Sequence, residues 1–134
     1  PCKVKASSSS QSDQLETRTT LMLRNLPEEF TQPKFIWLLN MEGFAGLYDF
    51  VYMPMNLTTQ DNFGYAFVNL VNTAMAEWCM QHFQGFSHWT VPSAKRCDAL
   101  WCDIQGRDAC IKRYRNSPIM HKSIPIGCQP ALFG

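Results

Sequence analysis

Four stretches of the chain have the apolar pattern of β-strands and are bounded by turn-forming residues. They cover residues 19–27, 48–54, 62–70 and 99–105. Pro27 closes the first stretch, because a proline cannot donate a backbone hydrogen bond to a sheet. A polar run before the third stretch, residues 56–62, is predicted to be a turn.

Apolar residues recur at helical spacing between these strands. Thr31 is the predicted cap of a first helix that ends at Gly43, and Asn72 caps a second that ends at Gly85. The order strand, helix, strand, strand, helix, strand predicts an α+β fold, with a four-stranded antiparallel sheet and two helices on one face. Residues 106–117 add a third predicted helix, which a tail follows.

The third strand places two aromatic rings on one face. Side chains alternate across a strand. One face therefore carries Tyr65, Phe67 and Asn69, and the other carries Ala66, Val68 and Leu70. The small aliphatic set suits packing under helices, whereas neighbouring rings suit the stacking of nucleic-acid bases. A strand buried on both faces is the alternative.

The first and last strands are expected to extend both faces. In the first, Leu21 and Leu23 are predicted to be buried, with Met22 and Arg24 opposite. In the last strand, Leu100, Cys102 and Ile104 are predicted to point inward, and Trp101, Asp103 and Gln105 outward. The outward Trp101 is expected either to stack on a base or to be covered by the C-terminal segment.

Composition and charge narrow the class of protein. Of 134 residues, 46% are hydrophobic and 17% charged, which indicates a globular domain. The net charge of +1 is not the strong positive field of a duplex-binding protein, so a nucleic-acid ligand would be held mainly by stacking and hydrogen bonds. No run approaches the ~20 apolar residues of a membrane span. Residues 1–17, with four consecutive serines, are predicted to be disordered, and the initial Pro1 indicates a piece of a longer protein.

Neither a metal site nor a catalytic site is predicted. The six cysteines form no Cys-x-x-Cys pair, and the three histidines lack zinc-ligand spacing, so free thiols in a reducing compartment are expected. A Gly-rich phosphate loop and paired carboxylates are also missing from the sequence. We therefore expect a protein that is not an enzyme and needs no cofactor.

Two segments resemble the signature motifs of the RNA recognition motif (RRM). Residues 63–70 are similar to its octamer motif and residues 21–26 to its hexamer motif. Phe63 stands where the family prefers Lys or Arg, and Met22 stands where it usually has a base-stacking aromatic. The resemblance implies an RRM, or ferredoxin-like, βαββαβ fold that binds single-stranded RNA on its sheet.

A longer resemblance covers residues 18–133. It is to the C-terminal RRM of the Mei-two-like RNA-binding proteins, which are meiosis regulators of fission yeast and their plant and protist relatives. The matching segments are 18–20, 24–27, 48–50, 52–54, 64–69, 104–106, 116–117 and 130–133. The resemblance implies a single domain over residues 18–134, monomeric within a larger nuclear or cytoplasmic protein, acting in post-transcriptional regulation of meiosis or differentiation.

The facing of the strand at residues 48–54 is ambiguous, because both of its parities are apolar. Asp49 resembles an aspartate that lies on the RNA side of many RRMs. The favoured arrangement therefore puts Asp49, Val51 and Met53 on the RNA face and Phe50 in the core. The opposite arrangement puts Tyr48, Phe50 and Tyr52 on the RNA face.

The predicted site combines stacking and polar residues. The RNA-binding set is Tyr65, Phe67, Met22, Arg24, Asn69, Trp101, Asp103 and Gln105. Three basic residues of the third helix are predicted either to contact phosphates or to form an ordinary solvated face: Lys112, Arg113 and Arg115. The alternative function is protein binding, in which the sheet is covered and the domain holds a peptide partner.

Overall fold

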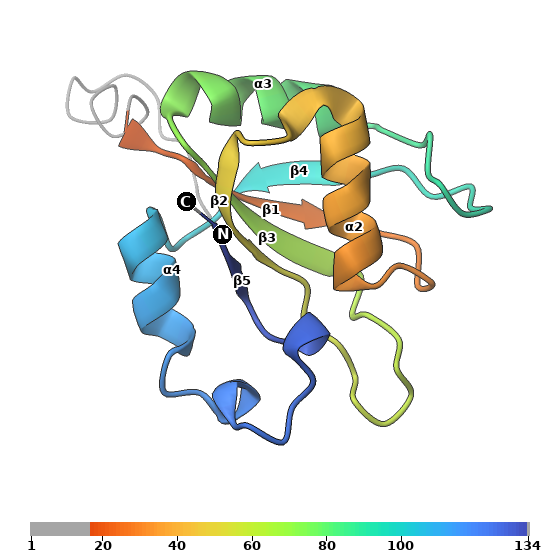
Figure 1. Ribbon diagram of the computed structural model, residues 1–134. Helices are drawn as coiled ribbons and strands as arrows, with labels where there is room; N and C mark the ends of the chain where they lie inside the picture. Colours follow the sequence, from red (N-terminus) through yellow and green to blue (C-terminus); the bar gives the residue numbers. More distant parts are fainter. Residues whose placement is uncertain (1–16, 134) are drawn as a thin grey trace.

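The computed structural model describes residues 17–133, and within that range the chain forms one antiparallel sheet (Figure 1). The strands are β1 (Thr20–Arg24), β2 (Tyr48–Tyr52), β3 (Tyr65–Leu70), β4 (Asp98–Trp101) and β5 (Ala131–Leu132), in the order β4-β1-β3-β2-β5. Apart from Thr17, the segment that was predicted to be disordered, residues 1–17, lies outside the described residues.

Two helices pack on one side of the sheet and a third lies on the other side (Figure 1). The helices are α2 (Gln32–Leu39), continued by the π-helical turn η1 (Asn40–Phe44), α3 (Thr73–Phe83) and α4 (Arg107–Tyr114), with 3₁₀ turns η2 (Pro118–Met120) and η3 (Ile126–Cys128) after them. Both predicted caps are confirmed, because the Thr31 and Asn72 side chains accept hydrogen bonds from backbone N–H groups of the first turns. The predicted ferredoxin-like fold is confirmed.

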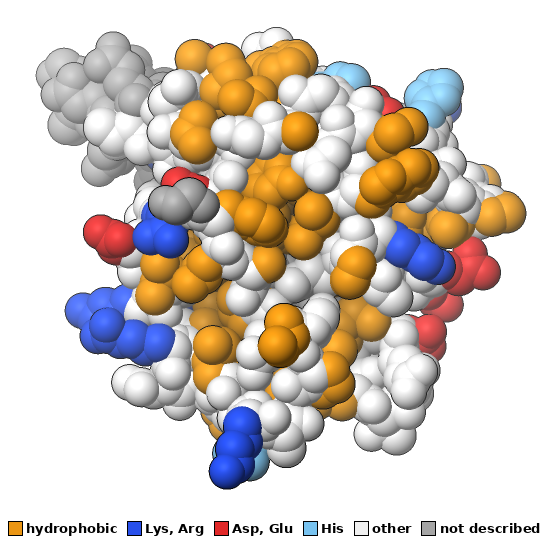
Figure 2. Space-filling model, in the orientation of Figure 1, with side chains coloured by type: hydrophobic (Ala, Val, Ile, Leu, Met, Phe, Trp, Pro, Cys, Tyr) orange, Lys and Arg blue, Asp and Glu red, His pale blue; other side chains and the backbone are white. Residues whose placement is uncertain are grey.

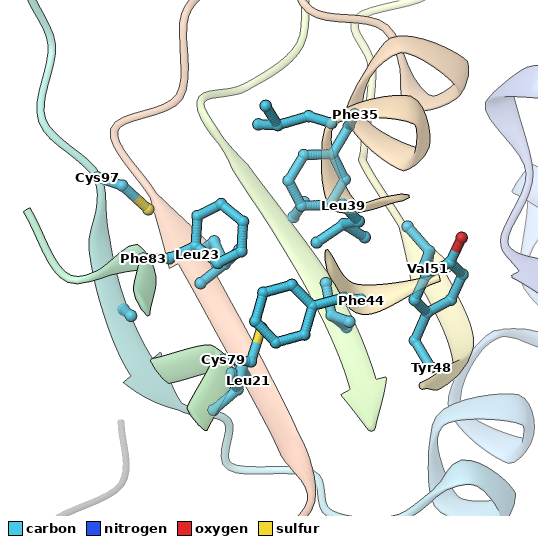
Figure 3. Packing of buried hydrophobic residues seen from close by; sticks show 14 of the residues in the cluster. Leu21, Leu23, Phe35, Leu39, Phe44, Tyr48, Val51, Cys79, Phe83 and Cys97 are labelled. Atoms are coloured by element: carbon cyan, nitrogen blue, oxygen red, sulfur yellow. The ribbon is translucent and has the colours of Figure 1, made fainter. Parts of the chain in front are cut away.

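The main core lies between the sheet and the pair α2 and α3. Leu21 and Leu23 of β1 pack there against Phe83 of α3 and Phe44 of η1 (Figure 3). The strand register confirms the predicted faces of β1 and β3, because Met22 pairs with Phe67 and Arg24 pairs with Tyr65. Directly paired residues of antiparallel strands share a face.

A β-bulge in β2 reverses the favoured facing of that strand. Tyr48 pairs with Leu70 and Phe50 pairs with Asn69, so Asp49 is an additional residue that shifts the alternation. The predicted facing is therefore wrong for three residues: Val51 and Met53 are buried in the main core, and Phe50 lies on the opposite face. Figure 3 shows Val51 beside Tyr48 in that core. The alternative arrangement was right for Phe50 and Tyr52 but wrong for Tyr48.

The predicted alternation of the last strand is also wrong. β4 ends at Trp101, which pairs with Leu21, whereas Leu100 pairs with Met22. Leu100 therefore shares the face of Met22, and Trp101 is on the side of the main core, against which it packs. Hydrophobicity could not separate the two parities, because Leu100 and Trp101 are both apolar.

The chain after α4 adds a fifth strand that the sequence pattern did not predict. β5 pairs with β2 through Val51–Ala131 and Phe50–Leu132. The ring centroid of Phe133 lies 5.1 Å from that of Tyr48. The tail is held further by Gln32, a buried side chain that donates to the Gln129 carbonyl at 2.7 Å and accepts from the Met53 N–H at 2.8 Å. The C-terminal segment thus closes the β2 edge of the sheet.

Five cysteines lie in the described part of the chain, and all five are free thiols, as predicted. Cys2 lies outside it. Burial raises the pKa of Cys97 to about 12 and that of Cys110 to about 11, so both thiols stay neutral at ordinary pH. Across residues 17–133, no group of three or more His, Cys, Asp or Glu side chains is placed to hold a metal ion. No helix in the same range is both long and apolar enough to cross a membrane.

Candidate functional site

The candidate site is the outer face, which is defined here as the side of the sheet turned away from α2 and α3. The strand register arranges its side chains in three rows across the sheet. The rows are Asp98–Arg24–Tyr65, then Leu100–Met22–Phe67–Tyr52, then Thr20–Asn69–Phe50. Aromatic residues therefore occupy β3 and β2, with an unbranched apolar side chain beside them on β1.

Tyr65 and Phe67 form a pair of partly exposed rings on β3. Their ring centroids are 5.6 Å apart and the planes are inclined by 74°. Both side chains are half-buried, and Met22 of β1, also half-buried, is the direct cross-strand neighbour of Phe67. Rings with one accessible surface, fixed on a strand, can stack planar bases of any sequence.

Helix α4 covers the β2 half of the outer face. The Tyr114 ring is stacked 6.3 Å from Phe50 and meets Tyr52 edge-on at 4.8 Å. Phe50 is consequently 0% exposed and Tyr52 6% exposed. Burial, followed by the nearby Tyr114 hydroxyl, raises the pKa of Tyr52 to about 12. These rings form a second core with α4 and are not accessible to a ligand in this arrangement.

A cavity of about 200 Å³ remains where α4 meets the uncovered half of the sheet. Met22 and Phe67 line it from the sheet, and Arg113 and Tyr114 line it from α4. Asp103, which is exposed, adds a carboxylate to the lining. The cavity therefore combines an apolar floor with charged groups at its wall.

Trp101 also contributes to the lining of this cavity, but not as the outward strand residue of the prediction. It is half-buried against the main core, and the Arg18 guanidinium carbon lies 4.5 Å from its ring centroid. This distance is typical of a cation–π contact, so one face of the indole is occupied by a cation. The structure thus places Trp101 at the border of the outer face, partly covered from the N-terminal side.

Two of the predicted base-reading side chains hold the sheet together. Asn69 is 3% exposed and accepts hydrogen bonds from the Thr19 and Thr20 hydroxyls, each at 2.7 Å, while its amide donates to Asp49 at 2.8 Å. The Gln105 amide oxygen accepts from the backbone N–H groups of Thr19 and Thr20 at 2.8 and 2.9 Å. Neither amide group is available to a base in this arrangement.

The charged candidates are exposed. Arg24 forms an ion pair with Asp98 at the end of β1. The side chains of Lys112 and Arg113 are exposed on α4, and that of Arg115 is exposed at the residue that caps its C-terminal end. Lys and Arg side chains gather at the left margin of Figure 2, where Figure 1 places α4. Because the whole chain carries a net charge of only +1, this is a local concentration of positive charge beside the outer face.

Comparison with known proteins identifies the kind of domain. A sequence model of the family described as RNA recognition motif 2 matches residues 18–115, which include both signature strands and α4. The chain belongs to the RNA recognition motif 2 family. This match and the relatives described next confirm the resemblance to the Mei-two-like RRMs.

The relatives of this RRM include Protein MEI2-like 2 from Oryza sativa subsp. japonica, 34% identical over 118 residues, and Meiosis protein mei2 from Schizosaccharomyces pombe, 34% identical over 110 residues. These alignments cover 88% and 81% of the chain but only 14% of each relative.

Solved structures share the fold. The structure of the RNA15 RRM matches with a TM-score of 0.56 and 14% identity, over 70% of this chain and 98% of that one. The Sxl-lethal protein/RNA complex matches with a TM-score of 0.52 and 19% identity, over 68% and 50% of the two chains.

Sequence reasoning missed three residues of the outer face of this RRM: Phe50, Tyr52 and Leu100. The alternative arrangement of β2 did place the first two on this face, but nothing in the local sequence pattern indicated the bulge at Asp49. It also missed the basic pair Lys95–Arg96, which lies one residue before β4 and is hydrogen-bonded to Leu26 and Asn25, just after β1. Two adjacent cations before a predicted strand were a signal that could have been used.

Proposed function

We propose that this RRM binds single-stranded RNA on the uncovered half of its outer face. The observation that carries the proposal is the pair Tyr65 and Phe67, two rings held 5.6 Å apart on one strand with accessible surface. Phe67 packs at the edge of the second core under α4 but stays half-buried, and Tyr65 belongs to neither core, so both rings keep surface that packing does not use. Stacking on one such ring contributes ~1–3 kcal/mol of binding free energy per base.

The neighbouring residues suit supporting roles. Met22 extends the apolar surface next to Phe67, and a thioether packs favourably on an aromatic base. Arg24 supplies a charge for a phosphate or a base edge, and Asp103 can accept hydrogen bonds from base amino groups. Asn69 and Gln105 act indirectly in this proposal. Asn69 ties β3 to the start of β1, and Gln105 ties the segment after β4 to the same part of β1.

Helix α4 forms the wall of the proposed site. Its exposed basic residues are candidate phosphate contacts, and they would position the RNA without reading its sequence. The candidates are Lys112, Arg113 and Arg115. The cavity between α4 and Phe67 then takes a base at the boundary between the covered and uncovered halves.

The relatives suggest the biological setting. We propose that the domain, residues 18–134, lies in a longer protein that acts in post-transcriptional regulation, in the nucleus or the cytoplasm. Meiosis or differentiation is the proposed process, since one relative is called a meiosis protein. RNA is the proposed partner, and the domain is proposed to act as a monomer without a cofactor.

A second candidate function is protein binding, and one observation favours it. Because α4 buries Phe50 and Tyr52, half of the aromatic surface of the outer face is closed to RNA. A domain with a smaller RNA surface can instead hold a peptide partner on its exposed apolar side chains.

Fluorescence anisotropy with a pool of short random-sequence RNAs distinguishes the two functions. Wild-type protein is compared with Tyr65→Ala/Phe67→Ala at two salt concentrations, with circular dichroism to verify folding. Trp37→Ala, which removes a ring 52% exposed on α2 of the opposite layer, is the matched control. Binding that is abolished only in the double variant supports the RNA proposal. A folded wild type that binds no RNA contradicts it and favours the peptide partner.

A further inference from the structure

A second hollow lies at the end of the sheet where β1 finishes and β3 and β4 begin. It has a volume of about 530 Å³, and its lining includes Phe63, Tyr65, Lys95 and Arg96. Arg24 and Asp98 complete the charged part of the lining. We call this hollow the end groove. Tyr65 belongs both to the end groove and to the outer face, so the two surfaces are continuous.

The end groove is positively charged although the chain as a whole is almost neutral. Its lining contains three cations, Arg24, Lys95 and Arg96, against one carboxylate, Asp98, which leaves an excess of two positive charges. The entire sequence has a net charge of +1. A cleft lined by one sign of charge attracts ligands of the opposite sign, and a nucleic-acid phosphate is such a ligand.

Hydrogen bonds hold the end groove in shape. The Asn25 side-chain amide donates to the Arg96 carbonyl at 2.9 Å, which ties the loop before β4 to the end of β1. The Lys95 ammonium donates to the Leu26 carbonyl at 3.3 Å, and the Arg96 guanidinium donates to the Gly85 carbonyl at 3.1 Å. Both partners are neutral carbonyls, so these hydrogen bonds orient the two cations without neutralising them.

Phe63 gives the end groove an aromatic surface. Its side chain is 55% exposed, directly before Gly64, whose positive φ of 93° turns the chain into β3. An isolated exposed ring is ordinary, but this one lines a cationic hollow next to Tyr65. A ring for the base and cations for the phosphate are the two elements of a single-stranded nucleotide site.

We propose that the end groove binds one further nucleotide of the RNA, beyond the nucleotide stacked on Tyr65. Phe63 stacks on its base, and Lys95 and Arg96 contact its phosphate. Phe63 stands at the start of the octamer segment, where the RRM family prefers Lys or Arg. In this proposal the loop before β4 supplies the positive charge that this position lacks. This inference rests on the proposed RNA-binding function. It extends the proposed RNA-binding surface from the outer face into the end groove.

The test compares end-groove variants with wild-type protein by fluorescence anisotropy against the random RNA pool. We expect Phe63→Ala to weaken binding about 5- to 150-fold, the effect of removing one stacking ring. For Lys95→Gln/Arg96→Gln we expect the slope of log affinity against log salt to fall by about 0.7 for each phosphate that the variant no longer binds. Trp37→Ala and Lys34→Gln, both exposed on α2, are the matched controls and are expected to match the wild type.

A second measurement does not depend on how the variants fold. The RNA pool is made with 5-iodouridine, irradiated in complex with wild-type protein, and the crosslinked peptides are identified by mass spectrometry. Crosslinks at Phe63 as well as at Tyr65 or Phe67 support the inference. Crosslinks confined to Tyr65 and Phe67 overturn it while leaving the proposed function intact. A wild type that binds no RNA overturns both.

Discussion

The outer face consists of two halves that both carry aromatic rings, but α4 covers only the half over β2. Over β3, Tyr65 and Phe67 keep accessible ring surface, whereas over β2, Phe50 and Tyr52 are sealed under Tyr114 of α4. The same residue types therefore serve as a candidate ligand surface in one half and as a second hydrophobic core in the other. The identity of a ring on this face does not define its role, because the position of α4 decides it.

The largest expected difference between the halves is in stability. Phe50→Ala should reduce the free energy of unfolding by about 3–5 kcal/mol, since it empties a fully buried ring site between the sheet and α4. Phe67→Ala should cost clearly less, because that ring is only half-buried. Urea denaturation of both variants measures the difference. Equal destabilisation would mean that the two halves are not distinct.

Removal of the covering ring is expected to have the next largest effect. Tyr114→Ala deletes two aromatic pairs, each worth about 0.5–1.5 kcal/mol beyond the area that it buries, so the pairs alone should account for a fall in stability of about 1–3 kcal/mol. RNA affinity should fall, but less than in Tyr65→Ala/Phe67→Ala, because Tyr114 lines only the cavity at the border of the proposed site and α4 need not move for RNA to bind. Anisotropy on the folded variant checks this. A large increase in affinity would show that α4 competes with RNA for the outer face.

The covered half should also be visible in an alkaline titration. Burial raises the pKa of Tyr52 from its ordinary 10.0 to about 12, so the folded state keeps the hydroxyl proton to a higher pH than the unfolded state does. The stabilisation by the neutral hydroxyl is complete below pH 10 and is lost as the pH rises toward 12. Comparing the tyrosinate absorbance of wild type and Tyr52→Phe isolates this group. An ordinary pKa for Tyr52 would contradict the burial under α4.

The smallest expected effect concerns the basic side of α4. Lys112→Gln/Arg115→Gln should lower the slope of log affinity against log salt by up to about 0.7 per residue, with little change in stability, because both side chains are exposed. Affinity measurements over a range of salt concentrations give this slope. Lys34→Gln on α2 is the control. A slope identical to that of wild type would make the basic residues of α4 an ordinary solvated face.

Much of the fold could be predicted because its signals are local. The caps at Thr31 and Asn72 depend on residues within one helical turn, and the faces of β1 and β3 follow from strict alternation. The facing of β2 could not be predicted, because a single additional residue at Asp49 reverses it and both parities are apolar. β5 has only two residues, which is too short for any periodicity to appear.

The site was only partly predictable for a different reason. Tyr65 and Phe67 lie in one contiguous segment, so their shared face could be inferred. The covered state of Phe50 depends on α4, which begins only at Arg107, and the end groove joins residues of β1, the turn before β3 and the loop before β4. Asn69 and Gln105 were assigned to RNA because alternation gives a direction but does not show which hydrogen bonds a side chain already makes.

A solution NMR titration of isotope-labelled protein with short single-stranded RNA tests most directly whether the two halves behave differently. We expect large chemical-shift changes at Met22, Tyr65 and Phe67, while the resonances of Phe50 and Tyr52 change little and their amides stay protected from exchange. Changes centred on Phe50, Tyr52 and α4, with loss of that protection, would contradict the division into two halves. That outcome would show that RNA binds by displacing the helix rather than beside it.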